Sequence, residues 1–436
     1  MNFLFVFSDQ QQRHATGCLS GGEVRTPTLD RLGREGVLAR RAYANNPVCT
    51  PCRIGMFSGL HSSRTDTHSN ADRIPPGLPT LADRLNRGGY RTSYVGKWHI
   101  GGAGNGPIPP ELRGGFTDFI GYQCYNGFRE GVCFYDERGR ERCYDAHRTD
   151  VTTDIALERL RGLARCGAPF ALFVSYQAPH YPVQPSCAYE AMYAGAEIRG
   201  RPNRAEVDPY TPTYSPPSPR PREDDPDYRR YGGDLHEYIR LYRAMVTQVD
   251  ANVARLMGAL ETLGLSAETA VFYTSDHGDM QGSHGLRNKC LPYEESAGIP
   301  LVARVPGGAR GLVCDAPLSS LDFYPTLLDL AGLPVPGGLD GRSFAPLLRQ
   351  GSECDASRPV FAERPKWCMI VRDGWKLVAD RTDDGLEPAM LFNLDTDPYE
   401  MRNLLDGPDC GDRRNRLWAD LVAWDRDVTS DRLPWG

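Results

Sequence analysis

A short segment beginning at Asn46 carries the residue types best suited to chemistry in this sequence. It reads NPVCTPCRIGMFSG over positions 46–59. Thr50 and Pro51 favour an N-cap and a first helical position, and the N-terminus of a helix attracts anionic groups. Cys49 and Cys52 also form the C-x-x-C pattern of a thioredoxin-like redox pair. The segment therefore predicts a nucleophile beside an anion site, a redox pair, or a buried structural thiol.

Two pairs of metal-binding residue types follow apolar segments that lie far apart in the chain. Asp9 and Gln10 follow the run at 2–8, and Asp276 and His277 end a later apolar run. Because the carboxyl ends of parallel strands meet at one edge of a sheet, we expect both pairs to lie together. Two carboxylates, an amide oxygen and an imidazole favour Ca²⁺, or alternatively Mg²⁺ or Mn²⁺, over tetrahedral Zn²⁺.

Cationic side chains are available to stabilise negative charge near this edge. Arg53 lies four residues after Cys49 and therefore on the same side of a helix. The other members of this basic set stand in loops and are Lys97, His99, His180 and Lys289. Asn70 and His284 are further candidates for the substrate pocket.

The elements that must position these residues alternate between apolar strands and amphipathic helices. Strands are predicted at 2–8, 90–95, 170–175 and 270–275, and helices at 26–36, 78–89, 153–163 and 235–263. Such alternation favours an α/β fold with a mostly parallel sheet flanked by helices. From about residue 359 short strands joined by turns indicate an antiparallel sheet, with a helix at 412–427 against it.

This pattern predicts two domains. Residues 1–350 form the catalytic domain, and residues 351–436 form a smaller α+β subdomain. Residues 181–235 interrupt the first domain with runs of Pro and Tyr. Long aperiodic segments of this kind are usually functional loops, so we expect this insertion to take part in substrate selection.

Composition narrows the class of protein. The 436 residues carry a formal net charge of -6, which predicts neither nucleic-acid nor membrane-surface binding. No apolar run is long enough to cross a bilayer, and the first residues lack the basic start of a signal peptide. The 13 cysteines have no repeating spacing and are read as mostly free thiols. We therefore expect a cytoplasmic protein, and the sequence predicts no oligomeric state.

A longer pattern favours one interpretation of Cys49. Cys49-x-Pro51-x-Arg53, followed by Gly59, resembles the signature of the type I, formylglycine-dependent sulfatases of the alkaline-phosphatase superfamily. Further segments match the same family: Gly96 to His99, Ala178 to His180, Lys289 after the Gly282 to Gly285 turn, and Leu391 to Leu404. The resemblance therefore runs from residue 2 to about residue 405.

The resemblance implies an alkaline-phosphatase-like fold and a modified nucleophile. A formylglycine-generating maturase would oxidise Cys49, and the product would share a divalent metal with Asp9, Gln10, Asp276 and His277. Gln10 stands where many members have Asp, and His277 where many have Asn. Cys52, where many members have Ser or Ala, is then read as a helix-packing thiol.

The resemblance also implies hydrolysis of a sulfate ester, of a carbohydrate or another small organic alcohol, to the alcohol and inorganic sulfate. A hydrated aldehyde at position 49 would attack sulfur, helped by the metal and Arg53. His180, or alternatively Lys289, would protonate the leaving alcohol. His99 would assist the second hydroxyl in expelling sulfate.

Three alternatives to a sulfatase remain open at this point. A phosphonate monoester or phosphodiester hydrolase of the same superfamily would share the Asp-Gln and Asp-His pairs, although Lys97-x-His99 argues against it. A thiol-disulfide oxidoreductase would use Cys49 and Cys52 but would leave the metal-type pairs without a role. A non-catalytic binding protein would keep Cys49 unconverted.

Overall fold

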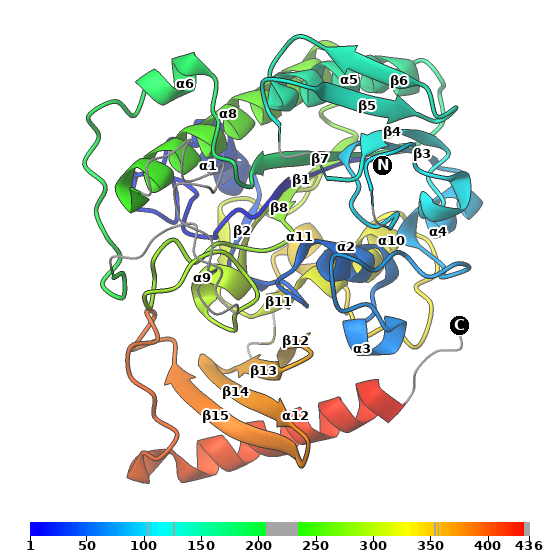
Figure 1. Ribbon diagram of the computed structural model, residues 1–436. Helices are drawn as coiled ribbons and strands as arrows, with labels where there is room; N and C mark the ends of the chain where they lie inside the picture. The colour runs from blue at the N-terminus through cyan, green and yellow to red at the C-terminus, as the bar shows by residue number, and fades with distance from the viewer. Residues whose placement is uncertain (103, 125–126, 206–233, 353–354, 356, 431–436) are drawn as a thin grey trace.

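The computed structural model describes residues 1–436 except 103, 125–126, 206–233, 353–354, 356 and 431–436. A central sheet of 11 strands runs through the molecule in the order β10-β2-β9-β8-β1-β7-β3-β4-β5-β6, with β11 paired to β2 (Figure 1). The strands are β1 (Asn2–Asp9), β2 (Val37–Tyr43), β3 (Arg91–Lys97), β4 (Asp118–Tyr122), β5 (Val132–Asp136), β6 (Glu141–Tyr144), β7 (Phe170–Pro179), β8 (Thr269–Ser275), β9 (Gly298–Arg304), β10 (Leu312–Cys314) and β11 (Leu318–Ser319).

The middle of this sheet is parallel, as predicted. β1 pairs in parallel with β7 on one side and with β8 on the other, and β7 in turn pairs in parallel with β3. Every residue of β1 is buried, which explains why the strand reads as a continuous apolar run rather than an alternating one. β9 and the β4–β6 meander add antiparallel strands on the two sides. The α/β prediction is therefore confirmed.

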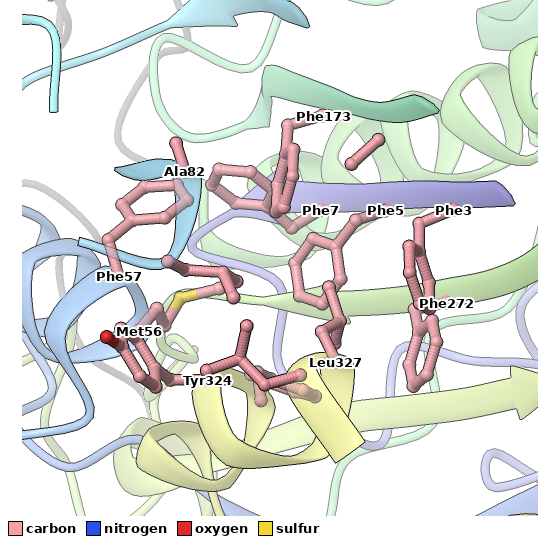
Figure 2. Packing of buried hydrophobic residues seen from close by; sticks show 14 of the residues in the cluster. Phe3, Phe5, Phe7, Met56, Phe57, Ala82, Phe173, Phe272, Tyr324 and Leu327 are labelled. Atoms are coloured by element: carbon pink, nitrogen blue, oxygen red, sulfur yellow. The ribbon is translucent and has the colours of Figure 1, made fainter. Parts of the chain in front are cut away.

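Alternate residues of β1 feed two separate cores. Phe3, Phe5 and Phe7 point to one face, where they meet Phe57 and Leu327 (Figure 2). The helices on this face include α2 (Cys49–Ser58), α4 (Leu81–Arg87), α10 (Phe323–Leu330) and α11 (Ala345–Gln350).

Leu4 and Val6 point to the opposite face of the sheet. The helices that cover it are α1 (Pro27–Glu35), α5 (Arg148–Ala164) and α8 (Leu235–Thr262). Because successive side chains of β1 point to opposite faces of the sheet, this one strand packs against both helical layers. Short helical segments complete the domain: α3 (Ser62–Thr65), α6 (Cys187–Ala191), α9 (Glu294–Ala297), η1 (Pro110–Leu112) and η3 (Ser320–Asp322).

The C-terminal part is an antiparallel sheet in the order β12-β13-β14-β15. Its elements are β12 (Val360–Arg364), β13 (Trp367–Arg372), β14 (Trp375–Thr382), β15 (Gly385–Asn393), η4 (Pro408–Cys410) and α12 (Gly411–Ser430). α12 packs on one face of this sheet, and the other face meets Tyr43 and Ala297 of the larger part. The antiparallel sheet and its final helix agree with the sequence, while the domain division at residue 350 stays a prediction.

Buried charges join the two parts. Lys376 of β14 lies 2.6 Å from Glu294 of α9 and 2.7 Å from Glu400, and all three side chains are buried. Arg13, which follows β1, forms an ion pair with the same Glu294. Removing one member of such a network leaves an uncompensated buried charge, so the network fixes the C-terminal sheet against the larger part.

The predicted insertion is only partly described. Its first part contains α6, and residues 206–233 lie outside the described residues, so its role in substrate selection stays a prediction. Cys133 and Cys143 form a disulfide across the β5–β6 hairpin, whereas ten other described cysteines are not disulfide-bonded. Over the described part of the chain, no helix combines the length and apolarity needed to span a membrane.

Candidate active site

Cys49 is the first residue of α2, so the helix begins two residues earlier than the sequence predicted. Val48 is the N-cap in extended conformation and makes no side-chain capping bond. The predicted N-cap role of Thr50 is therefore wrong. Its hydroxyl instead donates to the carbonyl oxygen of His99, and its N–H donates to Oδ1 of Asn70 at 3.1 Å. Pro51 is tolerated there because N–H groups of the first turn lack helical partners in any case.

The end of α2 explains the glycine of the motif. Gly59 closes the helix with φ 72°, a left-handed conformation, and its N–H donates to the carbonyl oxygen of Gly55. A residue with a side chain would be strained at this φ. All ten residues of α2 are buried, so the helix presents Cys49 from a rigid element.

Asp9, Asp276 and His277 surround the sulfur of Cys49. In-register pairing of Ser8 with Ser275 places the two aspartates side by side at the ends of β1 and β8. Sγ of Cys49 lies 3.2 Å from Nε2 of His277 and 3.7 Å from Oδ1 of Asp9. One candidate ligand atom from each of the four residues falls within 4.8 Å of the others, and all four residues are buried.

The chemistry of this donor set fits a divalent cation. Nδ1 of His277 lies 3.0 Å from the carbonyl oxygen of Gly278, which leaves Nε2 as the nitrogen that faces Cys49. A ring held in this way by its second nitrogen is the usual arrangement of a metal-binding histidine. Two buried carboxylates beside it supply the hard oxygen atoms that Ca²⁺, Mg²⁺ and Mn²⁺ prefer.

Gln10 lies at the same edge with its amide held in one orientation. Its Nε2 donates to Oδ2 of Asp279 at 2.9 Å and to Oδ1 of Asn288 at 3.1 Å. Its Oε1 therefore faces the other way and accepts from Nζ of Lys289 at 3.1 Å. Asp279 is fixed in turn by the hydroxyl of Tyr238 at 2.7 Å. The only signal for Asp279 in the sequence is its place at the end of the Asp276-His-Gly-Asp segment.

Arg53 supports the carboxylates from behind. Its Nε donates to Oδ2 of Asp276 at 2.9 Å, and its second terminal nitrogen donates to Oδ2 of Asp9 at 3.0 Å. The remaining nitrogen donates to the carbonyl oxygen of Lys97 and to the hydroxyl of Ser175. The sequence grouped Arg53 with cations that face an anion, whereas the structure places it on the two aspartates.

Two lysines face the sulfur directly. Nζ of Lys289 lies 3.0 Å from Sγ of Cys49, and Nζ of Lys97 lies 3.9 Å from it while also forming an ion pair with Asp9. Burial alone would raise the pKa of the Cys49 thiol, but Lys289, Lys97 and His277 outweigh it and hold this pKa well below its ordinary value. The position therefore stabilises a negatively charged group at residue 49.

His180 and His99 complete the pocket around Cys49. Burial lowers the pKa of His180, and the nearby charge of Lys289 lowers it further. Burial and the charge of Lys97 together lower the pKa of His99 to about 4. In both residues a contact with Cys49 acts in the opposite direction. Nδ1 of His180 lies 2.6 Å from the carbonyl oxygen of Tyr181, so its Nε2 is the nitrogen available to the pocket.

The two further substrate-pocket candidates lie in different places. Asn70 contacts the first turn of α2 through Thr50. His284 stacks on Tyr293 at 4.1 Å and groups with Glu295 and Glu400, which are already paired with Arg201 and Lys376. Its role in substrate binding stays a prediction, because no contact recorded among the described residues joins it to Cys49.

The C-x-x-C interpretation receives no support from the geometry. Cys49 and Cys52 are both free, and Sγ of Cys52 lies 3.7 Å from the hydroxyl of Ser320. Burial raises the pKa of the Cys52 thiol, with Asp276 adding to the effect. Cys52 is therefore a buried packing thiol beside Ser320.

Two protein-family models match this chain. The sulfatase family model matches residues 1–333, and the model of the C-terminal part of N-sulphoglucosamine sulphohydrolase matches residues 282–427. The uncharacterized sulfatase YidJ of Escherichia coli is 31% identical over 450 residues, covering 97% of this chain and 86% of the relative. An N-acetylglucosamine-6-O-sulfatase of Bacteroides thetaiotaomicron is 26% identical over 488 residues, covering 95% of this chain and 84% of the relative.

Solved structures share the whole fold. A putative sulfatase yidJ from Bacteroides fragilis superposes with a TM-score of 0.86 at 24% identity, covering 100% of this chain and 96% of the other. A protein solved in complex with its substrate D-glucosamine-2-N,6-O-disulfate superposes with a TM-score of 0.82 at 24% identity, covering 100% of this chain and 99% of the other. A phosphonate monoester hydrolase of Agrobacterium radiobacter superposes with a TM-score of 0.77 at 23% identity, covering 98% of this chain and 96% of the other.

Proposed function

The chain belongs to the sulfatase family and is a sulfuric ester hydrolase, and we propose that it acts on a sulfated saccharide through a formylglycine formed from Cys49. The observation that carries this proposal is the position of Cys49. It stands at the first residue of a buried helix, with metal-type ligands on one side and two lysines on the other.

The modification supplies a group that the thiol lacks. A hydrated aldehyde carries two hydroxyls on one carbon, so that one can attack sulfur and the other can later release sulfate. A serine in the same place would form a sulfate ester with no second hydroxyl to expel it. A formylglycine-generating maturase is therefore a required partner of this chain in the proposal.

The metal in this proposal is Ca²⁺, with Mn²⁺ or Mg²⁺ as alternatives. Asp9, Gln10, Asp276 and His277 would hold it, together with residue 49. A bound divalent cation would neutralise sulfate oxygens and lower the pKa of a hydroxyl next to it. Arg53 holds Asp9 and Asp276 in place, since both carboxylates are fully buried against its guanidinium group.

The remaining polar side chains of the pocket bind the ester and move protons. Lys97 and Lys289 face the sulfuryl group and stabilise the negative charge that develops on it. Nε2 of His180 gives a proton to the leaving alcohol, because the negative charge of the bound ester favours the protonated ring; Lys289 is the alternative donor. His99, whose low pKa keeps it neutral, accepts the proton of the second hydroxyl.

The saccharide part of the proposal is supported by two proteins to which this chain is similar. One is named an N-acetylglucosamine-6-O-sulfatase, and the other was solved with a glucosamine disulfate as its substrate. The second candidate activity is phosphonate monoester hydrolysis, which the likeness to phosphonate monoester hydrolases and the Asp-Gln and Asp-His pairs favour. The cytoplasmic location expected from the sequence stays a prediction.

One panel of substrates tests the proposal. Release of inorganic sulfate would be measured from an aryl sulfate, choline sulfate and glucosamine 6-sulfate, beside turnover of a phosphonate monoester, with the matured protein. We expect the largest kcat/KM for the sulfated sugar. A larger kcat/KM for the phosphonate would replace the proposal by the second candidate, and preference for choline sulfate would overturn its saccharide part.

A further inference from the structure

The turn between β12 and β13 brings two cationic side chains to the edge of the candidate active site. Arg364 is the last residue of β12 and pairs with Trp367, the first residue of β13. Pro365 and Lys366 form the turn between them, and both are exposed. This hairpin belongs to the C-terminal sheet, so its position relative to Cys49 depends on how the two parts of the molecule are packed.

Arg364 contacts both segments that flank the start of α2. One of its terminal nitrogens donates to Oδ1 of Asn46 at 3.3 Å and to the carbonyl oxygen of His68 at 2.6 Å. Asn46 precedes Cys49 in the same short segment, and His68 precedes Asn70, whose side chain accepts from the first turn of α2. The guanidinium group therefore lies at the border of the pocket.

The same hairpin also holds the loop that carries Lys289. Nε1 of Trp367 donates to the carbonyl oxygen of Cys290 at 3.0 Å, and the N–H of Cys290 donates to the carbonyl oxygen of Pro47 at 3.1 Å. Cys290 has φ 80°, a conformation that a residue with a side chain rarely adopts, so these two bonds hold a strained loop in place. The hairpin, the Lys289 loop and the segment before Cys49 are thus neighbours.

A groove with a volume of about 670 Å³ lies beside this junction. Its lining includes Leu291, Tyr293, Lys366, Trp367 and Arg381, together with one acidic residue, Asp380. The volume falls within the range of about 300–1,000 Å³ in which small-ligand sites are found. Leu291 follows the Lys289–Cys290 pair directly, so the groove begins next to the loop that reaches the nucleophile.

The cations at this junction differ in whether their charge is balanced. Arg381 is paired with Glu363 at 3.2 Å and with Asp425 at 2.6 Å. Arg364 donates only to uncharged acceptors, and neither Arg364 nor Lys366 makes an ion pair with any residue that the structure describes. Lys366 lines the groove, and Arg364 stands two residues before it, at the border of the pocket. Two cations without ion pairs at adjoining positions favour an anionic ligand.

We propose that Arg364 and Lys366 form a subsite for a second acidic group, a carboxylate or a sulfate, on the sugar next to the one that carries the scissile sulfate. The groove beside Lys366 receives that neighbouring sugar. This inference rests on the proposed saccharide function and deepens it, because it assigns the enzyme to polyanionic saccharides rather than to singly sulfated neutral ones. The guanidinium group of Arg364 suits paired oxygen acceptors, and the ammonium group of Lys366 adds charge.

Binding of matched saccharides tests the subsite without relying on turnover. A disaccharide with one sulfate and one uronic acid would be compared with the same compound whose carboxyl is reduced to an alcohol, and with a disulfated disaccharide. Dissociation constants would be measured by calorimetry on a Cys49→Ala background, alone and combined with Arg364→Gln, Arg364→Lys or Lys366→Gln. Arg416→Gln removes an exposed cation of α12 and is the matched control.

We expect the uronate or the disulfated compound to bind about tenfold more tightly than the reduced compound. A factor of about ten is what one hydrogen bond to a charged group contributes to binding. Arg364→Gln and Lys366→Gln should each lower this ratio severalfold, Arg364→Lys should retain part of it, and Arg416→Gln should leave it unchanged. Preference for one acidic compound identifies the acidic group. The inference is overturned by an unchanged ratio in Arg364→Gln, by equal binding of all three compounds, or by no measurable binding. Normal ratios without sulfate release by the matured enzyme would instead contradict the proposed function alone.

Discussion

The ammonium nitrogen of Lys289 lies 3.0 Å from the sulfur of Cys49, although the two residues are 240 positions apart. The same nitrogen donates to Oε1 of Gln10 at 3.1 Å. The loop after β8 therefore covers the nucleophile from one side, while the ends of β1 and β8 hold the carboxylates on another. Lys289 is buried, and its charge is compensated by the group at position 49 and by Asp9.

Replacing Lys289 should impair the chemical step more than folding. Lys289→Met keeps the length of the apolar stem but removes the charge, so kcat for sulfate release should fall by about 10²–10³, as when one charge-stabilising donor is lost. Steady-state kinetics on an aryl sulfate would measure this fall. Arg416→Met, which removes an exposed cation of α12, is the control. A loss confined to KM would mean that Lys289 only binds substrate.

Removing divalent cations should abolish sulfate release and lower the melting temperature. Ca²⁺ should restore both, because an ion that binds only the folded state stabilises that state. Asp279→Asn should raise the Ca²⁺ concentration needed by about 10–100-fold, since Asp279 orients the amide of Gln10. Asp412→Asn, on α12, is the control. Full activity in chelator would contradict the metal assignment.

Arg53 should contribute strongly to stability. Arg53→Ala leaves Asp276 buried without its arginine partner and Asp9 with Lys97 alone, and breaking a buried ion pair in this way costs about 3–5 kcal/mol. Urea unfolding in chelator would measure the change in the free energy of unfolding. Arg40→Ala breaks an exposed pair with Asp315 and should cost less than about 1 kcal/mol. Equal effects of the two substitutions would show that the buried arrangement is unimportant.

The junction between the two sheets should make stability depend on pH. Burial, with Glu294 and Glu295 adding to it, raises the pKa of Glu400 from 4.5 to about 7, although Lys376 opposes the shift. The folded state therefore holds this proton more tightly than the unfolded state. The resulting stabilisation is complete below pH 4.5, declines as the pH rises, and is lost above about 7.

Glu400→Gln removes this titration while keeping the size of the side chain. The free energy of unfolding of the original protein, relative to the variant, should fall by about 2–3 kcal/mol between pH 4.5 and 7.5. Urea unfolding at intervals of pH would provide the measurement. Parallel curves for the two proteins would refute the assignment to Glu400.

Much of the fold could be predicted because its strands and helices are regular in sequence. β1 is apolar at every position, and α8 carries Leu241, Met245 and Val249 at helical spacing, so both elements follow from local pattern. The start of α2 was misplaced because Thr50 and Pro51 are strong local signals. Tertiary contacts use the Thr50 hydroxyl for His99 instead, and the helix begins at Cys49.

The residues of the site could be listed from the sequence, but their partners could not. Asp9 and Asp276 were expected at one edge because parallel strands end together, and pairing of Ser8 with Ser275 brings them there. The bonds of Gln10 to Asp279 and Lys289 depend on the path of the loop after β8, which no periodicity specifies. Likewise, nothing local indicates that Arg364 reaches the segment before Cys49.

The most direct measurement is sulfate release by the matured protein and by Cys49→Ala, with intact-mass analysis of both. The protein co-expressed with a maturase should lose the mass expected for conversion of a thiol to an aldehyde at position 49 and should release sulfate. Cys49→Ala should do neither, while Cys52→Ala, which changes the packing thiol beside Ser320, should retain both. Sulfate release by Cys49→Ala at the rate of the unsubstituted protein would contradict the account.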